Sequence, residues 1–490
     1  MGNEDDLAKK QTFYDIHMHA FNLRHPSLSV FVRRALRETM AKLLKPRHWH
    51  RGVAIIGLCL VLVLLWVGYV ASLVIPWVGR RARKLITQAF KIVKRLIASV
   101  LNMLAIFDND VGSTLLVMEN CLRHEYNQLL DSKNLLRIGE NLYSEIVLTP
   151  LMMDFGHKGR TSPAELAQQQ KGRPPASVRK GKKLSHYDVP AEKPIVAQVV
   201  DVFAAITKYM NTTWSTKLQE DYPELGQGTK RVFHIYPFLG LNTANYDLDG
   251  LKKLLTKYFS DYRGLKEDLD QKMGQFDGHI ENLNSNFFAG IKVYPPLGFD
   301  PWPEDEIELD KVQELYRYAQ EKRIPVTCHG GSGGFRAVPL ATAVRFAAIP
   351  KWEAVLGSYP DLKLDLAHFP MKIRELTRRN RTFQLLMDNK NVYVDISCRA
   401  TTPDYYEALA QFISKLSEQE RTKFMQRLLF GSDFAVNLLW SESYNAYISL
   451  FRETTTLTPE DKQSLCSVNP ESFLFNEEPV TTPVGSVATS

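Results

Sequence analysis

Short β-branched or apolar segments recur along most of the chain and alternate with segments of helical periodicity. They predict strands over residues 12–21, 145–155, 231–241, 290–296, 324–330, 362–369, 392–398 and 427–434. Helical patterns lie between several of these strands, as over 308–323 and 405–425. Repeated strand–helix alternation builds parallel sheets, and eight such units close on themselves. We therefore expect an α/β fold, a (β/α)8 TIM barrel with its chemistry at the carboxyl ends of the strands.

A long insertion separates the first predicted strand from the second. We expect residues 1–20 to supply the first barrel strand and residues 21–140 to form a mostly helical insertion. Residues 141–475 hold the remainder of the barrel, and residues 476–490 read as a disordered tail. A length of 490 residues accommodates one barrel with such additions.

The insertion contains an uncharged hydrophobic segment over residues 53–78. As a helix its 26 residues would extend about 39 Å, enough to cross a hydrocarbon core of about 30 Å. Basic residues flank both ends, which favours the same side of a membrane for both. The segment 86–107 carries basic residues midway, typical of an amphipathic interfacial helix. We expect a monotopic anchor in which Leu60, Leu64 and Trp66 enter one leaflet; a helix buried in a homo-oligomer interface is the alternative.

Basic charge is concentrated in two places. Residues 21–110 hold 15 Lys and Arg against 3 acidic residues, and residues 158–183 hold 8 against 1, although the net charge is only +7. The rest of the chain is therefore acidic, and the two basic regions favour an anionic partner. The loop 158–183 lacks interleaved aromatic residues, so we expect anionic lipid headgroups as the partner and no nucleic acid.

Composition and cysteine usage describe a mainly globular protein of a reducing compartment. With 44% hydrophobic and 23% charged residues, the chain is neither disordered nor a bundle of membrane spans. The 5 cysteines never form a C-x-x-C pair, which argues against a disulfide framework or a zinc ribbon. Together with the basic flanks, these features suit the cytoplasmic face of a membrane.

Histidines and one aspartate gather at the ends of predicted strands. His17 and His19 are two residues apart on the first strand, so both imidazoles point the same way and suit one metal ion. His329, His368 and Asp433 end later strands and converge on the same rim of a barrel. Taken singly, each could be a hydrogen-bonded core histidine or a helix-capping carboxylate. Their shared position favours a metal site.

Asp15 and the glycine-rich residues 330–334 lie close in sequence to members of this set. Asp15 either orients a ligand from behind or sits one layer deeper in the barrel. Residues 330–334 match the G-x-S-x-G pattern of serine hydrolases. The acid and histidine that Ser332 would need reduce to Asp365 and His368 on one strand, a poor triad geometry, so we interpret the glycines as an active-site loop.

The motifs D-x-H-x-H, GIKVYPP, CHGG, LAHF and FGSD, in this order, resemble the amidohydrolase superfamily. Within it the chain is similar to the amidohydrolase-related branch, which contains aminocarboxymuconate semialdehyde decarboxylase and many uncharacterised TIM-barrel metal-dependent hydrolases. The resemblance covers residues 11–20 and 140–475 and fails over the insertion. It implies that the metal ligands are His17, His19, His329 and Asp433, with His368 beside the metal as an orienting or proton-transferring group.

The resemblance also bears on the number of metals. In binuclear members of the superfamily a carboxylated lysine on the fourth strand bridges two metals, and Lys292 would be that residue here. The branch favours one metal instead, with the second metal as the alternative. Imidazole and carboxylate donors suit Zn²⁺ first, and also Mn²⁺, Fe²⁺ or Co²⁺.

These features predict a membrane-associated metal-dependent hydrolase that directs a metal-activated water at an amide, ester or lactone. Asp433 would take the proton of the water, and His368 would polarise the substrate oxygen or protonate the leaving group. Both basic regions follow strands on the catalytic face, so the substrate is expected to be a small or lipid-like, amphiphilic molecule. A decarboxylase on the same scaffold and a non-catalytic membrane-bound scaffold remain the alternatives.

Overall fold

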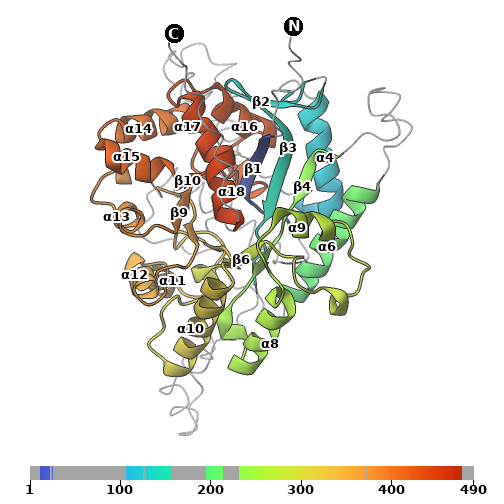
Figure 1. The fold of residues 1–490 in the computed structure, drawn as a ribbon, viewed down its shortest axis with the longest axis vertical. Helices are drawn as coiled ribbons and strands as arrows, with labels where there is room; N and C mark the ends of the chain where they lie inside the picture. Colours follow the sequence, from blue (N-terminus) through green and yellow to red (C-terminus); the bar gives the residue numbers. More distant parts are fainter. Residues whose placement is uncertain are drawn as a thin grey trace, which may run out of the picture.

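The computed structural model describes residues 11–22, 25, 106–124, 128–131, 133–155, 195–212, 231–370 and 372–476. Within them, parallel strands alternate with helices, in agreement with the predicted α/β class (Figure 1). The parallel strands are β1 (Gln11–Met18), β3 (Asn141–Pro150), β4 (Phe233–Ile235), β5 (Phe238–Gly240), β6 (Gly290–Val293), β7 (Val326–Cys328), β8 (Leu364–Leu366), β9 (Val392–Asp395) and β10 (Leu428–Leu429). A short strand, β2 (Leu136–Ile138), pairs antiparallel with β3.

The strand pairings run in a closed ring. One sheet joins β1 to β3 and β3 to β4, and the other runs in the order β10, β9, β8, β7, β6, β5. A parallel bridge between Leu151 and Phe238 links β3 to β5, and one between Met18 and Phe434 links β1 to the segment after β10. This is the connectivity of the predicted barrel, in which all carboxyl ends of the strands meet at one face.

Helices cover the outside of this ring (Figure 1). They are α4 (Val111–His124), α6 (Ile195–Asn211), α8 (Leu248–Phe259), α9 (Lys266–Lys272), α10 (Glu306–Glu321), α11 (Leu340–Phe346), α12 (Ile349–Ser358), α13 (Arg381–Asp388), α14 (Pro403–Ile413), α15 (Glu418–Met425), α16 (Tyr444–Glu453), α17 (Pro459–Gln463) and α18 (Asn469–Leu474). Single 3-10 turns occur at Thr243–Asn245, Ile280–Asn282, Pro295–Leu297, Ile373–Glu375 and Val436–Leu439, and a π turn at Ser464–Val468. The helix predicted over 308–323 is α10, whose N-cap Asp305 accepts hydrogen bonds from the amides of Ile307 and Glu308.

Two predicted elements are divided in the structure. The strand predicted over 231–241 is split into β4 and β5, because Pro237 between them has no amide hydrogen to donate to a strand ladder. The helical pattern over 405–425 is confirmed, and it is divided into two helices, α14 and α15, because Ser417 starts a new helix with a capping box.

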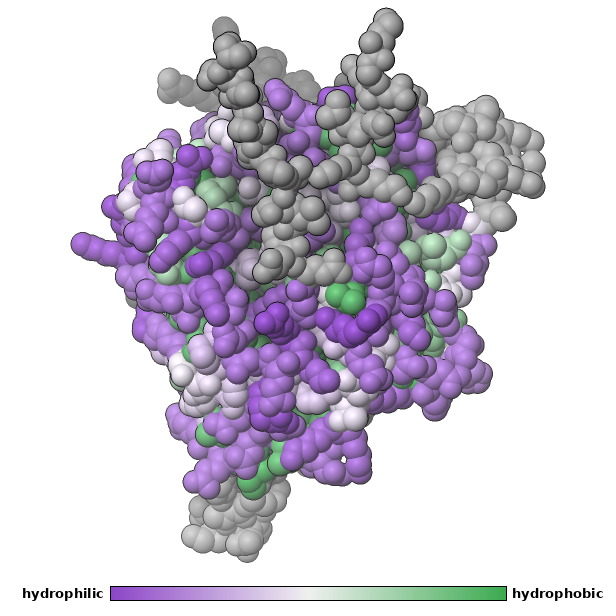
Figure 2. All heavy atoms as spheres, in the orientation of Figure 1, coloured by the Kyte–Doolittle hydropathy of each residue, from purple (hydrophilic) through white to green (hydrophobic). Residues whose placement is uncertain are grey.

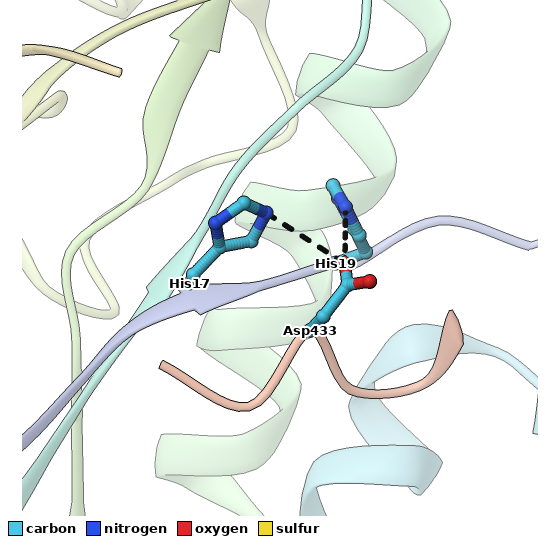
Figure 3. Close-up of side chains that lie close together, drawn as sticks. All are labelled: His17, His19 and Asp433. Atoms are coloured by element: carbon cyan, nitrogen blue, oxygen red, sulfur yellow. Dashed lines mark ion pairs between the residues drawn. The ribbon is translucent and has the colours of Figure 1, made fainter. Parts of the chain in front are cut away.

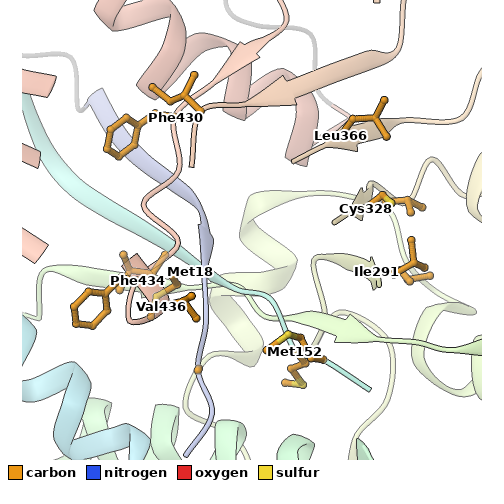
Figure 4. Packing of buried hydrophobic residues seen from close by; sticks show 14 of the residues in the cluster. Met18, Met152, Ile291, Cys328, Leu366, Phe430, Phe434 and Val436 are labelled. Atoms are coloured by element: carbon orange, nitrogen blue, oxygen red, sulfur yellow. The ribbon is translucent and has the colours of Figure 1, made fainter. Parts of the chain in front are cut away.

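The core packs in two clusters that follow the alternation of side chains along the strands. Residues such as Ile291, Cys328, Leu366 and Phe430 belong to the larger cluster (Figure 4). The smaller cluster gathers side chains of several strands against α18 and Phe475. Its members include Tyr14, Ile16, Val147, Phe238, Leu429 and Phe473. Because apolar side chains are buried on both faces of the strands, the strands are held in place, and so are their carboxyl ends.

The inserted regions lie mostly outside the described residues. The hydrophobic segment 53–78, with Leu60, Leu64 and Trp66, and the basic loop 158–183 are among them, so their predicted roles stay predictions. Of the range 21–140, the structure describes α4, which packs against α6, and β2. None of the helices described here has the length and apolar composition to cross a membrane. The face seen in Figure 2 is predominantly hydrophilic, with hydrophobic residues in scattered spots.

We expect Ser417→Ala to lower the free energy of unfolding by about 1 kcal/mol. The Ser417 hydroxyl accepts a hydrogen bond from the Glu420 amide at 3.3 Å, and the Glu420 carboxylate accepts one from the Ser417 amide at 2.8 Å. Urea unfolding of the full chain measures the change. Ser414→Ala, which removes an exposed hydroxyl at the end of α14, is the control. Equal losses in the two variants would contradict a role for the capping box.

Candidate metal centre

Four strands of the barrel bring the predicted site residues to one end of the ring. His17 lies in β1 and His19 directly after it, His329 directly follows β7, and His368 follows β8. Asp433 follows β10, and its amide donates a hydrogen bond to the His17 carbonyl at 2.6 Å. All five side chains are buried. These five residues therefore lie at the carboxyl ends of the strands, as the sequence predicts.

His17, His19 and Asp433 form a compact group (Figure 3). The Nε2 atom of His19 lies 3.0 Å from Asp433 Oδ1, and the Nε2 atom of His17 lies 3.6 Å from the same oxygen. Burial lowers the pKa of His17. Although burial raises the pKa of Asp433, the neighbouring imidazoles of His19, His368 and His17 hold it well below its usual value. The group therefore contains a carboxylate that faces two imidazole nitrogens.

The contacts of the Nδ1 atoms of His17 and His19 determine whether their Nε2 atoms carry a proton. His19 Nδ1 lies 3.0 Å from the Leu151 carbonyl oxygen, which only accepts, so Nδ1 carries the proton. His17 Nδ1 lies 2.6 Å from Asp395 Oδ2 and is protonated for the same reason. In the neutral imidazoles, both Nε2 atoms then present lone pairs toward Asp433. Lone pairs and a carboxylate repel one another unless a proton or a cation lies between them.

The donor set fits a divalent metal ion. The buried Nε2 atom of His17 makes no hydrogen bond among the described residues. Atoms bound to one tetrahedral zinc at about 2.1 Å lie about 3.4 Å apart. The separations of 3.0 and 3.6 Å between the two Nε2 atoms and Asp433 Oδ1 are close to this value. Two neutral imidazoles and one carboxylate are also ligands that suit zinc and its neighbours in the first transition series.

Asp395 is the functional residue that sequence reasoning missed. It ends β9, is completely buried and accepts hydrogen bonds from the amides of His368 at 2.8 Å and Ser397 at 3.0 Å. The Ser397 hydroxyl donates to Asp395 Oδ1 at 2.5 Å. Although burial raises the pKa of Asp395, His17 and these partners hold it far below its usual value. The signal available in the sequence was an acidic residue within the VYVDISC strand.

Hydrogen bonds from Asp395 extend to the other two histidines. Because the Ser397 hydroxyl donates to Asp395, its oxygen accepts from His368 Nδ1 at 2.8 Å. His368 Nε2 is then an acceptor for His329 Nδ1, which lies 3.1 Å away. One carboxylate thereby sets the tautomers of His17, His368 and His329, as carboxylates commonly do behind metal-binding histidines. Burial lowers the pKa of His368 to about 3.

His329 reaches the centre through His368. Its ring stacks on Tyr294 with 4.2 Å between centroids, and it is not part of the compact group of His17, His19 and Asp433. A second group with the geometry of a metal site contains His17, His368 and Asp395. The structure therefore brings together three of the four predicted ligands and connects the fourth by a hydrogen bond.

Lys292 lies in β6 and is completely buried beneath the centre. Burial lowers the pKa of its ammonium group, and the carboxylates of Asp395, Asp365 and Asp433 act in the opposite direction. Its Nζ atom makes no hydrogen bond among the described residues. Neither metal-like group contains Lys292, and its predicted bridging role stays a prediction.

Asp15 binds backbone at the junction of β1 and β10. Its Oδ1 atom accepts hydrogen bonds from the amides of His17 at 3.3 Å and Ser432 at 2.8 Å. Burial raises the pKa of this carboxyl group to about 7. A Cβ atom on Gly431 would lie 2.7 Å from the Cβ atom of His17, so glycine permits the close approach of these two segments. Asp15 thus positions the backbone that carries His17 and Asp433.

Two site residues adopt backbone conformations that side chains rarely occupy. His368 has a φ of 68° and Asp433 a φ of 60°, both in the left-handed region. Such conformations cost about 1 kcal/mol or more each and are concentrated at functional sites. The Asp395 bond to the His368 amide and the His17 bond to the Asp433 amide hold them in place.

Comparison with known families gives a match over the second half of the chain. Residues 277–475 match a family model described as Amidohydrolase. The resemblance to the amidohydrolase-related branch is thereby confirmed. The matched range contains His329, His368, Asp395 and Asp433, whereas His17 and His19 lie outside it.

Several solved structures are similar to the chain. A uronate isomerase from Bacillus halodurans has 14% identity and a TM-score of 0.36, with 97% of each chain covered. A probable 2-pyrone-4,6-dicarboxylic acid hydrolase from Acinetobacter baumannii has 10% identity and a TM-score of 0.34, covering 68% of this chain and 84% of its own. A 4-oxalomesaconate hydratase from Rhodopseudomonas palustris has 14% identity and a TM-score of 0.31, covering 66% and 95%. No curated protein sequence matches the chain.

Amidohydrolase superfamily members typically bind divalent metals, which agrees with the candidate ligand groups. No contact among the described residues supports the alternative in which Ser332 is the nucleophile of a serine hydrolase. Both ring nitrogens of His368 bond to Ser397 and His329. No hydrogen bond in the described part joins His368 to Ser332, so the amidohydrolase centre is the better-supported site.

We expect Asp395→Asn to weaken metal binding by 10- to 100-fold, because the amide cannot hold the charge behind His17 and can impose the wrong tautomer. Asp388→Asn, on the exposed surface of α13, is the matched control and should bind metal as the wild type does. Titration of the metal-free chain with zinc in the presence of a competing chelator measures the affinity. Equal affinities in the three proteins would rule out this role for Asp395.

Proposed function

We propose that this amidohydrolase is a metal-dependent hydrolase acting on an amide, ester or lactone. The observation that carries the proposal is the convergence of the His17 and His19 Nε2 atoms on one oxygen of Asp433. His329 is the fourth residue proposed to hold the metal. A divalent metal bound there supplies a Lewis acid and lowers the pKa of water toward neutrality.

The roles of the protein groups follow from their contacts. Asp433 accepts the proton of the attacking water, since its carboxylate lies against the Nε2 atoms of both His17 and His19. His368 orients His329, because its Nε2 atom accepts the hydrogen bond from His329 Nδ1. Its ring is fixed by Ser397 on one side and by His329 on the other. Asp395 keeps the imidazoles in the tautomers that leave their inner nitrogens unprotonated.

A recess beside these residues supports access of a small molecule. It has a volume of about 40 Å³ and is bordered by His329 and His368. Trp352 and Ile349 contribute apolar surface to it, and other lining residues, such as Asn380, contribute polar groups. Apolar walls with a few polar groups are typical of sites for small organic substrates.

We expect the purified full chain to hydrolyse simple esters, amides or lactones only with metal bound. Chelation should abolish activity, and one equivalent of zinc, manganese, iron or cobalt should restore it. His17→Ala/His19→Ala should lose both metal and turnover by at least 100-fold, because two of the ligands are removed. Asp388→Asn serves as the control. Release of carbon dioxide from carboxylate substrates without hydrolysis would favour a decarboxylase, and absence of metal and turnover would favour a non-catalytic scaffold.

We also propose that the hydrophobic segment 53–78 attaches the enzyme to the cytoplasmic face of a membrane. Its charge-free length and basic flanks support this. Leu60→Asp/Leu64→Asp should lower co-flotation with anionic phospholipid vesicles at least tenfold, because each buried charge costs several kcal/mol in a bilayer. Val117→Asp/Val468→Asp alters exposed valines of the described part and is the control. Unchanged flotation of the first variant, with a change in oligomeric state, would favour the oligomer alternative.

A further inference from the structure

A row of polar side chains crosses the barrel beneath the metal centre. Lys292 in β6 pairs with Thr327 in β7, and Thr327 pairs with Asp365 in β8. Paired residues of neighbouring strands point to the same face of the sheet, so these three side chains lie side by side. None of them is more than 1% exposed. The barrel therefore encloses an ammonium, a hydroxyl and a carboxyl group that are shielded from bulk water.

The carboxyl group of Asp365 lacks the partners that a buried negative charge requires. No donor among the described residues makes a hydrogen bond with either of its oxygens. Lys292 is a nearby cation, but its Nζ atom makes no hydrogen bond in the described part either. A buried carboxylate without hydrogen bonds is costly, whereas the protonated acid carries no charge and brings a donor of its own. The surroundings of Asp365 therefore favour its protonated form.

Asp395 offers an acceptor for that donor. The residue of β9 that pairs with Asp365 stands two positions before Asp395, so both carboxyl groups lie on the same face of neighbouring strands. Asp395 Oδ1 accepts hydrogen bonds from the amides of His368 and Ser397 and from the Ser397 hydroxyl. Among the described groups, Oδ2 accepts only from His17 Nδ1. Since each carboxylate oxygen has two acceptor sites, Oδ2 has room for one more donor.

The electrostatics divide the two carboxyl groups in the same way. Burial raises the pKa of Asp365 well above its ordinary value, and the Asp395 charge raises it further, while Lys292 acts in the opposite direction. The pKa of Asp395 is held far below its ordinary value by His17, against the effect of burial. When two carboxyl groups share a site, one commonly holds the proton while the other keeps the charge. Here the proton belongs to Asp365.

We propose that Asp365 is a carboxylic acid at neutral pH that donates a hydrogen bond to the Asp395 carboxylate, and that it is thereby a positioning residue of the metal centre. It acts through Asp395, which in turn orients His17. The Lys292 ammonium balances the one negative charge that the pair of carboxyl groups retains. The inference rests on the metal centre of the proposed function, but it holds for any reaction carried out there.

Two substitutions of similar size test the role of the donor. Asp365→Asn keeps a neutral donor in the same place, so zinc should bind with wild-type affinity. Asp365→Leu removes the donor, and zinc affinity should fall by about tenfold or more, because Asp395 loses part of its support. Asp388→Asn and Asp388→Leu, on the exposed surface of α13, are the controls. Titration against a competing chelator measures the affinities. If Asp365→Asn weakens zinc binding as much as Asp365→Leu does, Asp365 acts as a charged partner of Lys292 and the proposal is overturned.

Infrared difference spectroscopy observes the proton itself. At neutral pH the metal-free wild type should show the carbonyl band of a protonated carboxyl group, sensitive to D2O, that is missing from Asp365→Asn. Asp15, whose pKa burial raises to about 7, contributes to both spectra and cancels in the difference. This measurement does not need Asp365→Leu, so it also decides the case in which that variant fails to fold. Identical carboxyl bands in the two proteins would mean that Asp365 is ionised, contrary to the proposal.

Neither test uses turnover, so this inference and the proposed hydrolysis fail separately. If no ester, amide or lactone is hydrolysed but the infrared band and the zinc affinities are as expected, the hydrolase proposal fails and the role of Asp365 stands. If substrate is hydrolysed with zinc bound but Asp365→Asn retains the carboxyl band, the hydrolase proposal stands and the role of Asp365 is overturned. A chain that binds no metal would overturn both.

Discussion

The buried Asp395 carboxylate is the group on which the rest of the centre depends. A negative charge without access to water is tolerated only when it is fully hydrogen-bonded. Here the partners are the imidazole of His17, the hydroxyl and amide of Ser397 and the amide of His368. Satisfying this one charge therefore fixes the ring of His17, the backbone turn at His368 and the tautomers of His17, His368 and His329 at once.

The centre lies where the barrel closes. The last strand, β10, meets the first at the bridge between Met18 and Phe434, and Asp15 bonds to Ser432 across 417 positions of the sequence. Two of the proposed ligands come from β1 and one from the segment after β10, so closure of the ring is also assembly of the site. Left-handed backbone at His368 and Asp433 is retained because the neighbouring strands bond to the amides of both residues.

Two recesses of different character border this centre. The one beside His329 and His368 mixes polar and apolar groups, and the one beside His19 is almost wholly apolar. Residues of α4, the first described helix within the insertion 21–140, line the apolar recess. The described part of the range 21–140 therefore contributes to the surroundings of the site as well as to the packing of the barrel.

The periodicity of apolar residues alone predicts the order of strands and helices. The sequence also shows the H-x-H spacing directly, and the predicted strands place His329, His368 and Asp433 at strand ends. Local spacing could not show that Asp395 supports His17. The helical pattern over 405–425 likewise did not locate the point where Ser417 caps a new helix. Sequence patterns record which face of an element is apolar. Hydrogen bonds between side chains hundreds of residues apart depend on how the strands are staggered, which the packing of the whole barrel decides.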